Sequence, residues 1–158
     1  MRHASLLLIF FLVLFPILFL IPARSSLFAA RPWRIFVAPF ADAPGAMMLR
    51  DEIVKLLSSQ PGITVVTDAS QADFILAGSG ETYIRGYVGT NPRVRYLNSD
   101  ARPVYGGFLS VELKPPGQET VWSYLVTPRR FGPQDIYPNL AGQVVPKLIE
   151  AVRRQQQP

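Results

Sequence analysis

The stretch Arg34-Ile35-Phe36-Val37-Ala38-Pro39-Phe40 decides the fold that this sequence predicts. It is an apolar run of strand length, and Pro39 lacks the amide hydrogen that a continuing strand needs, so we expect a buried strand. A helix is expected next, with Asp42 as its cap and one apolar face. That face carries Leu49, Ile53, Leu56 and Leu57. Pro61-Gly62 ends the helix, and the β-branched segment 63–67 predicts a second strand, which completes a β-α-β unit.

The middle of the chain predicts further strands of the same sheet. Residues 68–73 are read as a polar turn or short helix that leads to a third strand over 74–83, where Gly78 and Gly80 indicate a bend or close packing. Residues 85–103, rich in Gly, Pro and Arg, predict a long loop or an irregular hairpin. The alternating runs 105–113 and 120–127 flank Pro115-Pro116-Gly117-Gln118 and predict an antiparallel hairpin.

A second helix closes the chain, with Asp135 as its cap. Its apolar residues recur every four positions: Ile136, Leu140, Val144, Leu148 and Val152. Pro138 suits the first turn, whereas Pro146 inside the helix should kink it at a cost of roughly 3 kcal/mol. The predicted fold class is α/β (α+β), in the order β-α-β-(turn or short α)-β-β-β-α. We expect a mixed sheet of about five strands with two main helices packed on it, preceded by an N-terminal apolar helix.

Residues 1–30 are read as a signal peptide or a membrane anchor, and residues 31–158 as one small domain. The run 4–21 has no charge and only Pro16 interrupts its apolar character. Its length falls between the 7–15 residues of a typical signal core and the roughly 20 of a transmembrane span. Ala23-Arg24-Ser25 offers a cleavage site with small residues at the required positions. We therefore expect export to, or tethering in, the bacterial envelope, with the domain periplasmic or otherwise extracytoplasmic.

The residue types of the domain exclude several kinds of catalysis. His3 is the only histidine of the sequence and there is no cysteine, so residues 31–158 contain neither. A Ser-His-Asp triad, a Cys-His pair, His- or Cys-ligated metal and the lipid-accepting cysteine of a lipoprotein are all excluded. We expect no enzyme, no cofactor and no metal. A carboxylate-dependent hydrolase stays open, because two acids suffice for that chemistry.

The best candidate for a partner-binding site is the segment 83–105, in which four arginines are interspersed with four tyrosines. The candidate residues are Tyr83, Arg85, Tyr87, Arg93, Arg95, Tyr96, Arg102 and Tyr105. Tyrosine and arginine are enriched at binding hot spots, and arginine suits carboxylate or phosphate partners. The alternative is a solvated loop with its aromatic residues packed down. Removing Arg2 and Arg24 from the 16 basic residues leaves 14 against 11 acidic ones, a net +3 that does not indicate nucleic-acid binding.

Three segments resemble a group of bacterial envelope modules: the CsgG-like family, the synthase activator LpoB and the N-terminal domain of TolB. The opening strand Ile35-Phe36-Val37-Ala38-Pro39-Phe40 is similar to theirs. So are the helix 49–57 with Gly62-Ile63-Thr64-Val65-Val66, and the stretch Ala72-Asp73-Phe74-Ile75-Leu76-Ala77-Gly78. The resemblance spans about 34–152 and implies binding or assembly work in the envelope, without catalysis or cofactor. It carries over neither secretion-channel nor synthase-activator function.

These observations together predict a non-catalytic accessory protein of the envelope. It would dock a protein or an anionic envelope polymer through residues 83–105, and contact a membrane through residues 4–21 if the leader is kept. Two alternatives are a carboxylate-dependent hydrolase and a purely structural subunit that oligomerises through its hairpin edge.

Overall fold

The computed structural model describes residues 31–89 and 101–155. Its elements are β1 (Trp33–Val37), α2 (Ala46–Ser58), β2 (Ile63–Val66), the 3₁₀ turn η2 (Ala69–Gln71), β3 (Phe74–Gly89), β4 (Ala101–Lys114), β5 (Trp122–Val126) and α3 (Ile136–Arg154). The strands form one five-stranded sheet in the order β2-β1-β3-β4-β5. The expected α/β fold, with a mixed sheet and two main helices, is confirmed. The expected N-terminal apolar helix falls outside the described residues.

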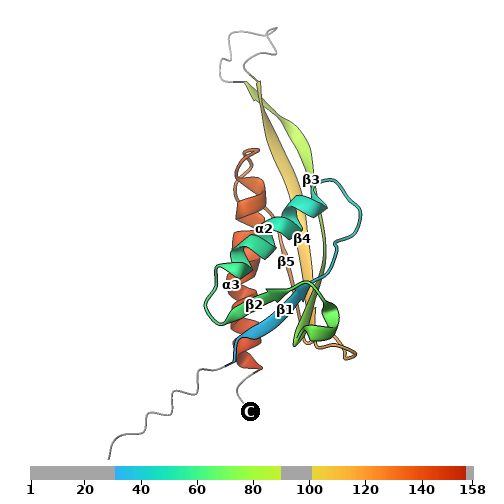
Figure 1. Cartoon of the computed structure of the whole chain (residues 1–158). Coiled ribbons are helices and arrows are strands. Elements are labelled where there is room, and N and C mark those ends of the chain that lie inside the picture. Colours follow the sequence, from blue (N-terminus) through green and yellow to red (C-terminus); the bar gives the residue numbers. More distant parts are fainter. Residues whose placement is uncertain (1–30, 90–100, 156–158) are drawn as a thin grey trace, which may run out of the picture. The chain divides into compact units, whose positions relative to one another are not determined.

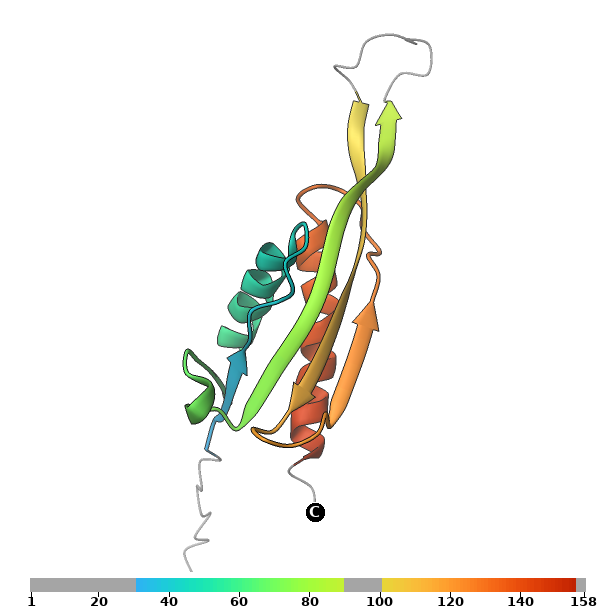
Figure 2. The ribbon, with the colours of Figure 1, turned by 90° about the vertical axis from the view of Figure 1, so that its right-hand side faces the viewer.

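The sheet is mixed because β1 is parallel to both of its neighbours, β2 and β3. The α2 crossover returns the chain to the same end of the sheet, as a parallel pair requires. β3 and β4 are antiparallel, and β5 adds to the far side of β4 in the same sense. Both α-helices lie on one face of the sheet, so within the described ranges the other face carries no α-helix (Figures 1 and 2).

The core lies between the sheet and the two helices. Apolar side chains of alternate strand residues, such as Ile35, Leu76 and Leu109, point into it and are fully buried. From α3 come the five residues of the predicted stripe, all of them in the buried cluster. From α2 come Leu49, Ile53 and Leu57. The helical periodicity of the sequence therefore identified both buried helix faces.

Two glycines of β3 serve close packing, one of the two roles expected for them. A Cβ on Gly78 would lie 2.7 Å from the ring of Phe40, and one on Gly80 would lie 2.7 Å from a methyl group of Leu49. Both contacts are shorter than real Cβ atoms make. The glycines thus let α2 and the β1–α2 connection approach the sheet directly.

The start of α2 differs from the prediction. Gly45, with φ 79°, occupies the N-cap position, and no side chain caps the helix, so Asp42 is not its cap. Pro44 and Gly45 delay the first helical turn, because a left-handed residue cannot belong to the helix. The N-cap of α3 is Asp135 as predicted, but its carboxylate makes no capping hydrogen bond.

The ends of β3 and β4 were also predicted wrongly. The third strand runs to Gly89 rather than Tyr83, and the fourth begins at Ala101 rather than Tyr105. Residues 84–89 and 101–104 are paired strands with a register shift between Ile84 and Gly86. Of the two readings of 85–103, the irregular hairpin is therefore confirmed for the described residues. Helix α3 contains Pro146 and continues to Arg154. Its proline is exposed.

Candidate partner-binding surface

The predicted site lies on the distal ribbon, defined here as Tyr83–Gly89 of β3 and Ala101–Gly106 of β4. The two strands pair throughout this ribbon. β1 pairs with β3 only at Phe74–Leu76, and β5 pairs with β4 only at Leu109–Leu113, so neither extends along the ribbon. Figures 1 and 2 show the two strands running on together past the ends of both helices.

A β-bulge at Arg85 sets the two faces of the distal ribbon. Before it, Tyr83 pairs with Gly106 and Ile84 with Tyr105; after it, Tyr87 pairs with Pro103 and Val88 with Arg102. Because paired residues share a face and neighbours alternate, Ile84 and Tyr87 lie on the helix side. Tyr83 and Val88 lie on the open side of the sheet. The extra residue shifts the pairing register by one. Tyr83 and Tyr87, which a regular strand would place on the same face, therefore lie on opposite faces.

The predicted site residues of the ribbon differ in exposure. Tyr83 is 50% exposed and Tyr87 65% exposed, while Arg85 and Arg102 are also exposed. Tyr105 is different, since it packs against the core and its amide donates to the carbonyl of Phe131. The structure therefore brings Tyr83, Arg85, Tyr87 and Arg102 to one exposed hairpin, and assigns Tyr105 to packing. Arg93, Arg95 and Tyr96 lie outside the described residues.

Sequence reasoning missed the aliphatic part of this surface. Ile84 is 47% exposed, Val88 is 58% exposed, and nearby Phe131, whose carbonyl receives the Tyr105 amide, is 43% exposed. Val88 fell within 85–103, which was read as a long loop or an irregular hairpin, and Ile84 lay just past the predicted strand 74–83, so neither was assigned to a face. The only available signal was the alternation of Tyr83, Arg85 and Tyr87 with the aliphatic residues Ile84 and Val88. The bulge at Arg85 interrupts this alternation, so it does not predict the faces correctly.

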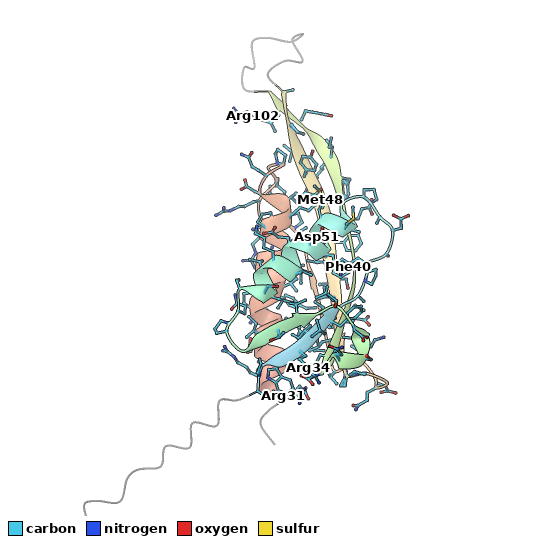
Figure 3. The ribbon with its side chains drawn as sticks, in the orientation of Figure 1. Arg31, Arg34, Phe40, Met48, Asp51 and Arg102 are labelled. Carbon is cyan, nitrogen blue, oxygen red and sulfur yellow. The ribbon has the colours of Figure 1, made fainter. Side chains whose placement is uncertain are left out.

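The ribbon is positively charged. Over Thr82–Gly89 and Ala101–Val111 the charged side chains are Arg85 and Arg102, and there is no acid. Figure 3 shows Arg102 at the end of the domain opposite to Arg31 and Arg34. The residue at which the leader would join the domain, Arg31, is thus remote from the candidate surface.

A second surface feature is a hollow of about 770 Å³ between the β1–α2 connection and the first turn of α2. Phe40 and Met48 lie on this side of the domain (Figure 3), and Met47 and Met48 are 75% and 57% exposed. Its lining also includes Arg50 and Tyr137. The hollow holds a single carboxylate, Asp42, so it lacks the two acids that a hydrolase of this kind needs.

The carboxyl groups with altered pKa values serve structure. The Arg34 guanidinium, which donates to Asp73 at 3.0 Å, lowers the pKa of that carboxyl. The Ser70 amide lowers the pKa of Asp68, and Lys147 and Arg154 lower the pKa of Glu150. A general acid needs a raised pKa, so none of these three fits that role.

Within 31–89 and 101–155, no three His, Cys, Asp or Glu side chains come together in a way that would hold a metal ion. In the same ranges, no helix is both long and apolar enough to cross a bilayer.

Comparison with known proteins reveals a shared fold. No protein-family model matches the chain, and no curated protein matches its sequence. Among solved structures, the hypothetical protein CT253 from Chlamydia trachomatis is 11% identical with a TM-score of 0.52, covering 77% of this chain and 99% of its own. Protein XCC0632 from Xanthomonas campestris is 16% identical with a TM-score of 0.50, covering 80% and 89%.

A lower TM-score, 0.49, relates the chain to the PelC dodecamer from Paraburkholderia phytofirmans, which is 18% identical and covers 73% of this chain and 86% of its own. CT253 and XCC0632, at their low identities, share the fold alone with this chain. The resemblance read from the sequence is thus supported as far as an α/β fold group. Kinship with the CsgG-like, LpoB or TolB families stays a prediction.

Proposed function

We propose that this protein is a non-catalytic accessory protein of the bacterial envelope, exported or tethered through residues 1–30. It docks a protein partner or an anionic envelope polymer through the distal ribbon. The observation that carries the proposal is the gathering of Tyr83, Arg85, Tyr87 and Arg102 on a hairpin with which no third strand of residues 31–89 and 101–155 pairs. Arg93, Arg95 and Tyr96 belong to the same proposed surface by sequence.

The cost of such a surface supports a binding role. An isolated two-stranded hairpin is marginally stable in water, and exposed apolar groups gain nothing from folding. Here four large apolar side chains of the ribbon are about half exposed or more: Tyr83, Ile84, Tyr87 and Val88. A partner that covers these four side chains would bury their apolar surface and so gain the hydrophobic free energy that folding alone does not provide.

The position of the ribbon supports a tethered arrangement. Arg31 and Arg102 lie at opposite ends of the domain (Figure 3). A chain held at its amino-terminal end would present the ribbon away from the point of attachment, where a partner can reach it.

Capture from the native membrane and periplasmic fraction tests the proposal. Full-length chain serves as bait, and the captured protein and captured uronic-acid or phosphate polymer are both measured after cross-linking. Changing Arg85, Arg93, Arg95 and Arg102 together to Gln should abolish capture and leave the thermal melt nearly unchanged.

The matched control removes the same number of charges elsewhere. Arg31, Lys147, Arg153 and Arg154 are all exposed, so their joint replacement by Gln should leave capture unchanged. Equal capture by the ribbon variant and the parent chain would refute the proposed docking surface.

A further inference from the structure

The distal ribbon exposes apolar side chains on both of its faces. Ile84 and Tyr87 lie on the helix side, and Tyr83 and Val88 on the open side, with exposed fractions of 47%, 65%, 50% and 58% in that order. A protein that docks on one face would leave the other face in water. A medium that surrounds the ribbon would cover both.

The same ribbon discourages the addition of another strand at its edges. Pro103 has no amide hydrogen to offer, and the bulge at Arg85 interrupts the ladder. Proline, charged residues and bulges are the features by which natural sheets protect open edges. We therefore expect a partner to contact the side chains of the ribbon, and not to pair with its backbone as an additional strand.

The side chains of the ribbon match the boundary between lipid headgroups and acyl chains. Tyrosine suits this boundary, because its ring is apolar and its hydroxyl can stay hydrated. Arg85 and Arg102 are both exposed, and no acid opposes them in Thr82–Gly89 or Ala101–Val111. Arginine near a membrane surface is attracted to anionic headgroups.

We propose that the partner of the distal ribbon is the surface of an anionic lipid bilayer. The ribbon lies in the headgroup region with both faces in contact with lipid, and Arg85 and Arg102 bind lipid phosphates. It does not cross the bilayer, because its open edges carry backbone groups that need water or headgroups as partners. This inference rests on the proposed function, since it names the partner of the same surface.

The position of the ribbon relative to Arg31 determines how the experiment is arranged. The ribbon and Arg31 are at opposite ends of the domain (Figure 3), so our inference includes binding of a second bilayer through the ribbon while residues 1–30 are held by a first. Full-length protein is therefore placed in nanodiscs of zwitterionic phosphatidylcholine, and separate vesicles are then added. Vesicles of phosphatidylcholine alone are compared with vesicles that contain phosphatidylglycerol.

Flotation measures whether the nanodisc-held protein follows the vesicles. We expect binding to phosphatidylglycerol vesicles and none to phosphatidylcholine vesicles. Replacing Arg85 and Arg102 by Gln should weaken binding roughly 25-fold, about fivefold for each arginine. The control R153Q/R154Q removes two exposed arginines from the opposite end and should bind as the parent does. No flotation, or equal losses in the two variants, overturns the inference.

A site-specific reporter tests the contact itself. The sequence contains no cysteine, so Val88→Cys and Ser123→Cys each give one labelling position for an environment-sensitive dye. Ser123 is exposed on β5, outside the ribbon. On addition of phosphatidylglycerol vesicles, we expect the dye at position 88 to brighten at least twofold with a blue shift, and the dye at position 123 to stay unchanged. Flotation without a signal at position 88 also overturns the inference.

The two proposals fail in different ways. Capture of a protein or a polymer that depends on the ribbon arginines, without vesicle binding, removes the lipid inference and leaves the proposed docking surface intact. Association of the chains with one another through the ribbon, in place of vesicle binding, would make a second copy the partner and would equally overturn the lipid inference.

Discussion

The hydroxyl oxygens of Thr82 and Tyr137 lie 3.1 Å apart and form a hydrogen bond between β3 and α3. Thr82 is 5% exposed, and it is the only buried residue with a polar side chain among the described residues. Its amide also donates to the carbonyl of Pro44 at 2.9 Å. One residue at the base of the distal ribbon thus joins β3 to both the β1–α2 connection and α3.

Removing either hydroxyl should destabilise the domain. We expect Thr82→Val and Tyr137→Phe each to lower the free energy of unfolding by about 1 kcal/mol, the usual net value of such a hydrogen bond. The double variant should cost less than the sum, because both partners are then apolar. Urea unfolding of the four proteins measures this coupling, and strictly additive losses would show that the two hydroxyls do not depend on each other.

Gly45 should tolerate no side chain. Its φ is 79°, and a Cβ there would lie 2.1 Å from Oγ1 of Thr82 and 3.1 Å from the Tyr137 ring. Gly62 has nearly the same φ, 81°, but open space around its Cβ position. We expect Gly62→Ala to cost about 1–2 kcal/mol from left-handed backbone alone. Gly45→Ala should exceed it by about 2 kcal/mol or more, because the clash adds to the backbone cost.

Comparing Gly45→Ala with Gly62→Ala separates the cost of the steric clash at position 45 from the cost of the left-handed backbone, which both variants share. Thermal and urea unfolding of the two variants give the difference directly. Equal losses would mean that Thr82 and Tyr137 move aside at little cost, and the junction at the base of the ribbon would then be looser than its geometry indicates.

The elements that were predicted correctly are those in which a periodic pattern coincides with burial. The helical stripe of α3 faces the core along its whole length, and the run around Ile35 and Val37 is a buried strand. The hydrophobic effect acts on both, so sequence spacing and structure agree. Gly78 and Gly80 were read as a bend or close packing, and close packing is observed, because a Cβ at either position would meet Phe40 or Leu49 at 2.7 Å.

The errors occurred where local chemistry competes with tertiary contacts. Asp42 is a good cap by residue type, but Gly45 takes the N-cap position next to Thr82 and Tyr137. The glycines and prolines of 85–103 left a long loop and an irregular hairpin open, and cross-strand pairing, which carries β3 to Gly89 and β4 back from Ala101, decides for the hairpin. A bulge that no residue type announces then decides which face Tyr83 and Tyr87 occupy. The exposed candidate residues could be chosen by type, and their faces could not.

Asp73 should link stability to acid pH. Its carboxylate accepts hydrogen bonds from the backbone amide of Arg34 at 2.9 Å and from the guanidinium at 3.0 Å, and the guanidinium bond in particular lowers its pKa. A lowered pKa in the folded state gives stability that is fully present above the unfolded value of about 3.9. That stability is lost as pH falls through the lower, folded pKa.

The variant Asp73→Asn should remove this dependence. At pH 7 we expect it to lower the free energy of unfolding by about 1–3 kcal/mol, because the charged hydrogen bonds are lost. The gap between parent and variant should narrow below about pH 4 as the parent's carboxyl becomes protonated. Urea unfolding from pH 2 to pH 7 measures the gap. A constant gap would assign the loss to geometry and not to charge.

Tyr83 and Tyr87 should separate into a packing residue and a contact residue. The ring of Tyr83 covers its cross-strand partner Gly106: a Cβ on that glycine would lie 2.9 Å from the ring. We therefore expect Tyr83→Ala to lower the free energy of unfolding by about 1 kcal/mol, since it uncovers the glycine backbone. Tyr87 is 65% exposed, so Tyr87→Ala should change stability by less than about 0.5 kcal/mol.

The binding assays should rank the same two variants in the opposite order. Tyr87→Ala removes an exposed ring from the helix-side face of the ribbon and should weaken vesicle binding while the melt stays unchanged. Tyr83→Ala should shift the melt first, and its binding loss should be partly restored by Tyr83→Phe, which keeps the ring over Gly106. If Tyr87→Ala binds as the parent does, the helix-side face is not in contact with the partner, and the proposed contact of both faces with lipid is overturned.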